Sequence, residues 1–91
     1  DRRIRNILNE QVERYGVKYH RLRHRNAGNR LIVEVHLLFC DNLTIAEAHE
    51  IASRIENCLQ IQLPQPTEVI THLEPEETHD LVHEKVFGRG E

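Results

Sequence analysis

In two stretches of the chain, apolar residues recur every three or four positions, as they do on one face of a helix. The first stretch covers residues 1–14, and Gly16 just beyond it is suited to ending a helix. The second begins with the capping-box pattern Thr44-x-x-Glu47 and ends before Pro64, because proline cannot continue a helix. The apolar positions are Ile4, Ile7, Leu8 and Val12 in the first stretch and Ile45, Ala48, Ile51, Ala52, Ile55 and Leu59 in the second. We therefore predict two amphipathic helices.

Three further stretches show the alternation that is typical of β-strands: residues 17–26, 30–41 and 67–74. The loop between the first two is Ala27-Gly28-Asn29, and its glycine favours a hairpin turn. The second stretch is the clearest strand, because its alternate positions form one apolar face: Leu31, Val33, Val35, Leu37 and Phe39. The predicted order of elements is α-β-β-α-β.

The register of this hairpin determines which side chains meet. If the loop has three residues, His20 lies directly across from His36. The same register leaves Arg21 and Arg23 on the apolar side of the sheet. Either a bulge in the first strand or a position of His20 at its very end would resolve this conflict, and the sequence does not choose between them.

The element order also predicts the architecture. A right-handed crossover through the second helix makes the last strand parallel to one hairpin strand and places both helices on one face of a three-stranded sheet. The opposite, partly apolar face then has no predicted element to cover it, which is typical of a surface that dimerises or docks. A chain of 91 residues suits one small domain, which we expect in residues 1–75, followed by an acidic, histidine-containing tail in residues 76–91.

Seven histidines are numerous for this length, and imidazole is the side chain that ionises near neutral pH. His72 and Glu74 point to the same side of the last strand, because side chains alternate along it. Pro75 closes that strand, since it has no N–H to continue the ladder. His49 falls at the margin of the apolar stripe of the second helix, from where it can face a sheet edge or a partner chain.

Several of these motifs together resemble a known family. They are His20-Arg21-Leu22-Arg23-x-Arg25 with Gly28, Val35-His36-Leu37, Asp41-x-Leu43-Thr44 with Ala48-His49, and Val69-Ile70-x-His72-x-Glu74-Pro75. In this order and at these spacings, residues 1–75 resemble the cytoplasmic C-terminal domain of cation diffusion facilitator transporters, the zinc transporter dimerisation domain. The resemblance implies a metallochaperone-like, ferredoxin-like α+β fold and a homodimer on the cytoplasmic side of the membrane, beneath a membrane domain of the same polypeptide.

The resemblance also implies a set of metal ligands near the dimer interface: His20, His36, His49, His72 and Glu74. Many members of the family carry aspartate where this chain has Glu74. Imidazoles with one carboxylate suit Zn(II) best and also Co(II), Ni(II) or Fe(II), rather than Mg(II) or Ca(II). Five donors exceed the four of a tetrahedral ion, so two ions that share Glu74 and one ion with an alternate ligand both fit.

Three other histidines lie outside this set. His24 matches no part of the family pattern, and we expect it on the surface. His79 and His83 have the i,i+4 spacing of a ligand pair on a helix, although a frayed tail fits that segment equally well.

The implied function is regulatory. Metal that binds the histidine cluster would stabilise a homodimer, and its binding free energy would bias the membrane domain of a divalent-metal efflux transporter toward export. We expect no enzymatic activity, because the sequence has neither a nucleophile with a base nor a glycine-rich phosphate loop.

Two other classes of function remain open on sequence grounds. Arg21, Arg23, Arg25 and Arg30 make the hairpin basic, which would suit nucleic acid or anionic lipid. The net charge of −3 and the few aromatic residues argue against nucleic acid, which we do not expect as a partner. The metal-responsive regulatory domain of a transcription factor is the other alternative.

Composition adds three expectations. The chain has no methionine, which suggests a piece of a longer protein. No apolar run approaches the roughly 20 residues of a membrane span, so the fragment itself should be soluble. Cys40 and Cys58 have no C-x-x-C spacing and are expected to be reduced, half-buried thiols.

Overall fold

The computed structural model describes residues 1–76 and contains the predicted elements in the predicted order. Helix α1 (Arg2–Tyr15) is followed by the hairpin strands β1 (Lys18–Ala27) and β2 (Arg30–Phe39). Helix α2 (Ile45–Gln62) then leads to β3 (Thr67–Pro75). The boundaries lie within two residues of those predicted, and the expected tail lies almost entirely outside the described residues.

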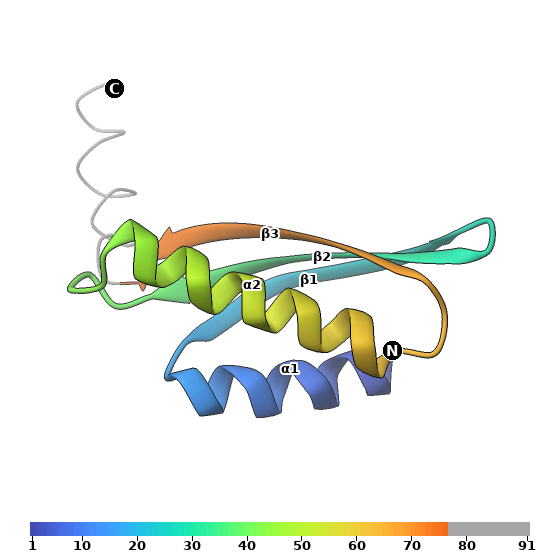
Figure 1. The fold of residues 1–91 in the computed structure, drawn as a ribbon, viewed down its shortest axis with the longest axis horizontal. Coiled ribbons are helices and arrows are strands. Elements are labelled where there is room, and N and C mark those ends of the chain that lie inside the picture. The colour runs from blue at the N-terminus through green and yellow to red at the C-terminus, as the bar shows by residue number, and fades with distance from the viewer. Residues whose placement is uncertain (77–91) are drawn as a thin grey trace, which may run out of the picture.

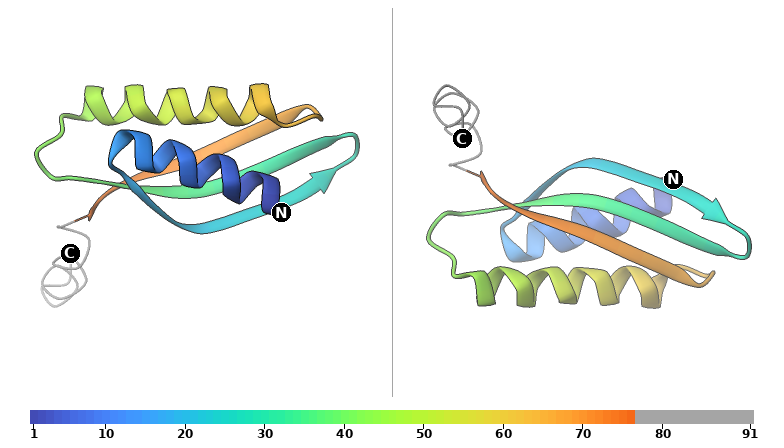
Figure 2. Two further views of the ribbon diagram at one scale, coloured as in Figure 1. Left: turned by 90° about the horizontal axis from the view of Figure 1, so that it is seen from below. Right: turned by 90° about the horizontal axis from the view of Figure 1, so that it is seen from above.

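The three strands form one sheet in the order β1-β2-β3. Strand β2 is antiparallel to β1 and parallel to β3, as the crossover through α2 predicts. Both helices lie on the same side of the sheet, with α1 and α2 side by side (Figures 1 and 2). The α-β-β-α-β fold with two helices on one face is therefore confirmed.

The core lies between the sheet and the helices. Residues of β2 alternate between buried and half-buried along the strand, so one face of β2 packs and the other does not. The largest fully buried side chains come from three elements, α1, β2 and α2: Ile4, Leu8, Leu37, Ile55, Leu59, Val33 and Val35. We call the other side of the sheet, which carries Glu34 and His36 of β2, the open face. Within the described part of the chain, no helix lies over it (Figure 2).

The ends of the helices are those that the sequence predicts. Gly16 caps α1 with a positive φ of 69°, a conformation that glycine adopts without strain. The Thr44 hydroxyl accepts a hydrogen bond from the Glu47 N–H, and the Glu47 carboxylate accepts one from the Thr44 N–H. This reciprocal capping box fixes the start of α2 and the direction in which it crosses the sheet.

The hairpin loop is shorter than predicted. Ala27 pairs with Arg30, so the loop has two residues rather than three. A bulge between His20 and Arg23 adds one residue back to β1, and His20 still pairs with His36 as predicted. The shorter loop and the bulge each shift the strand pairing by one residue, in opposite directions, so the two shifts cancel at His20.

Of the two alternatives that would keep the arginines out of the apolar side, the structure contains the bulge. At the bulge, Arg21 has a positive φ of 55° and an exposed side chain. Leu22 packs partly buried against the core, and Arg23 pairs with Glu34, whose side chain lies on the open face. Neither arginine therefore enters the apolar side of the sheet.

Both cysteines are free, as predicted. Cys58 is half-buried, whereas Cys40 is exposed just after β2 and not half-buried as expected. Among the described residues, no helix is long and apolar enough to span a membrane.

Candidate metal centre

Three histidines form a row across the sheet. His20 of β1 pairs with His36 of β2, and His36 pairs with His72 of β3. Paired residues on neighbouring strands point to the same side, so all three imidazoles lie on the open face. On β3, Thr71 points the other way and donates a hydrogen bond to Glu56 of α2 at 2.6 Å. The alternation predicted for β3 therefore places His72 and Glu74 on the open face.

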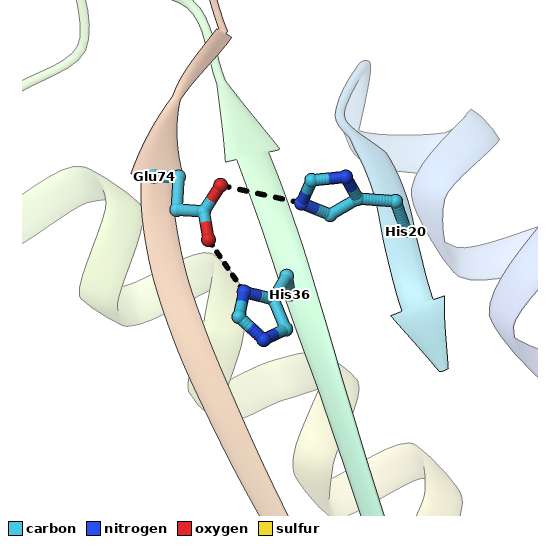
Figure 3. Close-up of side chains that lie close together, drawn as sticks. All are labelled: His20, His36 and Glu74. Atoms are coloured by element: carbon cyan, nitrogen blue, oxygen red, sulfur yellow. Dashed lines mark hydrogen bonds and ion pairs between the residues drawn. The ribbon is translucent and has the colours of Figure 1, made fainter. Parts of the chain in front are cut away.

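Glu74 joins two of these imidazoles (Figure 3). Its Oε1 lies 3.2 Å from Nε2 of His20, and its Oε2 lies 2.5 Å from Nδ1 of His36. The three side chains are partly shielded, with exposed fractions of 32%, 19% and 24% for His20, His36 and Glu74. A carboxylate on β3 thus connects histidines from both other strands.

His72 has a different carboxylate partner. Its Nε2 lies 2.8 Å from Oε2 of Glu34 on β2. Its ring also stacks on that of His36, with centroids 4.4 Å apart and planes 19° from parallel. The His20 ring meets the His36 ring edge-on, with centroids 5.4 Å apart. The residues Glu34, His72, His36, Glu74 and His20 therefore form a continuous series of contacts, which we call the ladder.

The environment of Glu74 favours its charged form. Burial raises the pKa of this carboxyl, but the hydrogen bonds from His36 and His20 outweigh it, so that the pKa lies below its ordinary value of 4.5. Glu74 is consequently ionised at neutral pH and able to ligate a cation.

The structure does not bring His49 into this group. His49 is exposed on α2, and α2 covers the side of the sheet opposite to the open face. Within one chain, the sheet therefore separates His49 from the ladder, and of the two directions expected for His49 the one toward a partner chain stays open. His24 is exposed, as predicted, and its Nε2 lies 2.9 Å from the amino nitrogen of Asp1. His79 and His83 lie outside the described residues.

Sequence reasoning missed Glu34. A signal was present, because Glu34 precedes His36 by two positions and so shares its face of β2. Its contact with His72 depends on the register between β2 and β3, which the sequence does not state.

The arrangement fits a metal ion. The residues form two groups, and within each group the donor atoms lie within 4.8 Å of one another. One group consists of His20, His36 and Glu74, and the other of Glu34, His36 and His72. Bonds from zinc to nitrogen or oxygen are about 2.0–2.2 Å, so donors on one tetrahedral ion lie roughly 3.3–3.6 Å apart. Small side-chain movements would close either group around an ion, and imidazole with carboxylate is a donor set that zinc accepts.

Fold and site together define a small α+β domain with a candidate metal centre on its uncovered sheet face. The family model described as "Cation efflux protein, cytoplasmic domain" matches residues 1–76, and the chain belongs to this family. This is the cation diffusion facilitator family indicated by the sequence motifs. Membership favours the transporter interpretation over a transcription factor or a nucleic-acid-binding module.

Individual relatives agree with this assignment. The chain is 36% identical over 66 residues to metal tolerance protein C1 of Arabidopsis thaliana, covering 71% of this chain and 14% of that protein. It is 39% identical over 56 residues to the cation-efflux pump FieF of Pectobacterium atrosepticum, covering 62% of this chain and 18% of the pump. The chain therefore spans only a small part of the length of these curated relatives.

A solved structure supports the fold directly. The Zn form of CzrB superposes with a TM-score of 0.76 at 32% identity, and the match covers 84% of each chain.

Proposed function

We propose that this chain is the regulatory metal-binding domain of a divalent transition-metal efflux transporter, with Zn(II) as the preferred ion. The observation that carries the proposal is the convergence of His20, His36, His72 and Glu74 from three strands onto one open sheet face. These side chains are half-buried or exposed, so an ion reaches them from solvent. The donor chemistry and the likeness to the Zn form of CzrB favour zinc.

We further propose that the open face meets a second copy of the chain. Ile70 on this face is 40% exposed, and Ile32 and Leu38 are only half-buried. A partly apolar face around a metal centre gains from burial in a homodimer. His49 is exposed on α2 and cannot reach the ladder of its own chain, so His49 of the second copy supplies the further imidazole.

Metal then acts by joining elements that are otherwise separate. Donors from different strands and from two chains must converge on the ion, so binding free energy becomes free energy of dimer formation. In a full-length transporter, the same free energy would shift the membrane domain toward its exporting conformation.

Calorimetric titration of Zn(II) into wild type and His72→Ala tests the metal centre. Loss of a ligand should lower the affinity or the number of ions bound, and we expect a reduction of at least about 100-fold in the affected binding step, since even groups that only orient ligands contribute about 10- to 100-fold. The matched control is His24→Ala, which removes an exposed imidazole away from the ladder. Equal stoichiometry and affinity in wild type and His72→Ala would refute the role of His72.

Sedimentation velocity with and without Zn(II) tests the dimer. Wild type should shift toward the dimer when Zn(II) is added, and His49→Ala should shift less, although its own ladder is intact. Identical zinc responses of the two proteins would exclude His49 from the interface site.

A further inference from the structure

The basic residues of this chain are concentrated in its first third, and most of the acidic residues follow them. Residues 1–30 contain nine of the 12 lysines and arginines and three of the 15 aspartates and glutamates, which gives this segment a net charge of +6. Residues 31–91 carry the other charges and have a net charge of −9. The overall charge of −3 therefore conceals a strong separation of charge along the chain.

The fold gathers five of these arginines at one end of the domain. The first turn of α1 carries three of them, and the hairpin of β1 and β2 carries two close to its turn. The start of α1 and the hairpin turn point toward the same end of the domain (Figures 1 and 2). The amino nitrogen of Asp1 lies 2.9 Å from Nε2 of His24, so the two elements also touch there. We call these five arginines the basic end: Arg2, Arg3, Arg5, Arg25 and Arg30.

Little negative charge opposes the basic end. Its five side chains are exposed. Arg3 lies 3.3 Å from the carboxylate of Asp1, and Arg30 lies 3.4 Å from that of Glu68. The other three arginines of the basic end form no ion pair with any residue that the structure describes. The basic end therefore presents guanidinium groups whose charge is available to an external anion.

Acidic groups occupy the opposite end of the domain. Strands β2 and β3 are parallel and both end there, where Phe39 pairs with Pro75. Asp41 follows β2, Glu47 lies in the first turn of α2, and Glu74 lies next to the end of β3. A domain with opposite charges at its two ends is turned by an anionic surface so that its basic end approaches that surface.

Lipid headgroups and nucleic acids both offer the phosphate groups that guanidinium binds well. Binding to single-stranded nucleic acid commonly uses aromatic rings that stack on bases. Within the described part of the chain, the tyrosines and phenylalanine lie away from the basic end: Tyr15 ends α1, Tyr19 is near the start of β1, and Phe39 ends β2. The family to which the chain belongs consists of cytoplasmic domains of cation efflux proteins, which act at membranes. These observations favour lipid over nucleic acid.

We propose that the basic end binds the anionic headgroups of a membrane surface. The guanidinium groups donate hydrogen bonds to lipid phosphates, and the negative surface potential of an anionic leaflet attracts their positive charge. Binding orients the domain with the basic end toward the bilayer and the acidic end away from it. None of the five arginines belongs to the ladder, so this interaction goes beyond the proposed function and does not require a bound metal.

Cosedimentation with lipid vesicles tests the proposal on the 91-residue chain, with a chelator present so that metal cannot bridge protein and lipid. The vesicles contain either phosphatidylcholine alone or three parts phosphatidylcholine to one part phosphatidylglycerol. Wild type should bind only the second kind. Each arginine near an anionic surface contributes a factor of roughly five to binding, so Arg25→Gln should weaken it about 5-fold and the double variant Arg2→Gln, Arg5→Gln about 25-fold.

The matched control is the double variant Arg14→Gln, Arg54→Gln, which removes the same charge as the α1 double variant. Arg14 lies in the last turn of α1, and Arg54 lies on α2 in an ion pair with Glu50, so both are away from the basic end. At about 0.1 M salt, charges more than about 10 Å from the surface are largely screened, and the control should lose less than about 3-fold. Circular dichroism of each variant establishes that the fold is kept.

Salt provides an independent check. Raising it from about 0.1 M to about 1 M shortens the screening length from about 10 Å to about 3 Å and should abolish binding to the anionic vesicles. Binding that persists at the higher concentration would contradict an electrostatic contact.

Three other results would overturn the inference. The first is that wild type binds the two kinds of vesicle equally or binds neither. The second is that the control loses as much affinity as the double variant of Arg2 and Arg5, since net charge alone would then govern binding. The third is that a DNA duplex binds more tightly than anionic vesicles at equal phosphate concentration and is weakened by the same variants, which would make the basic end a nucleic-acid surface. Zinc titration of the same variants should match wild type, so failure here is distinct from failure of the proposed metal centre.

Discussion

The two faces of the sheet have opposite properties although they are made from the same strands. On the covered face, every apolar residue of β2 from Leu31 to Phe39 is at most 4% exposed, and the helices exclude water from it. On the open face, residues of the same strand are half-buried and include Glu34 and His36. Adjacent residues such as His36 and Leu37 thus have separate roles, because side chains alternate along a strand. The candidate metal centre therefore lies on the face of the sheet that is not part of the packed core.

The largest expected effect comes from the covered face. Leu37→Ala removes a fully buried side chain between the sheet and the helices, and should lower the free energy of unfolding by about 2–5 kcal/mol. Urea denaturation in the presence of a chelator measures this. A loss below about 1 kcal/mol would contradict the assignment of Leu37 to the packed core.

Substitution of the neighbouring residue, His36, should lower metal affinity rather than stability. His36→Ala removes the imidazole common to both donor groups, and Zn(II) affinity should fall by more than about 100-fold. Without metal, its free energy of unfolding should change by less than about 1 kcal/mol, since the side chain is not in the core. Calorimetry and urea denaturation of the same sample give both values. A loss of stability as large as that of Leu37→Ala, with zinc affinity unchanged, would reverse the roles assigned to the two faces.

The smallest effect concerns the pH dependence of the metal-free protein. Because the pKa of Glu74 is lower in the folded chain than its ordinary value of 4.5, its ionised form stabilises the fold above that pH. The stabilisation is lost as the pH falls through the lowered pKa. Glu74→Gln should lack this component, which we expect to be below about 1 kcal/mol because the site is partly solvated.

Thermal unfolding of both proteins between pH 3 and 6 in chelator, read at about one-unit steps, measures the difference. The two curves should converge at the acidic end and separate above it. Parallel curves over this range would show that His20 and His36 do not stabilise the Glu74 carboxylate.

Much of the fold follows from local signals in the sequence. The period of the apolar residues defines the two helices, the capping box at Thr44 fixes where α2 begins, and the apolar alternation of β2 separates its two faces. Each of these signals acts through residues only a few positions apart, so it can be recognised without a tertiary structure. The same alternation places His72 and Glu74 together on β3.

Tertiary structure decided which residues of different strands contact one another. The pairing of His20 with His36 depends on a two-residue loop and a bulge whose shifts cancel. The residue pattern offered the bulge only as one of two alternatives, and it did not indicate the shorter loop. The contact of Glu34 with His72 depends on the β2–β3 register, and the separation of His49 from the ladder depends on which side of the sheet α2 covers. The sequence by itself determined which side chains share a strand face. Only packing between distant segments determined which of them meet, because register and layer are set by contacts across the whole domain.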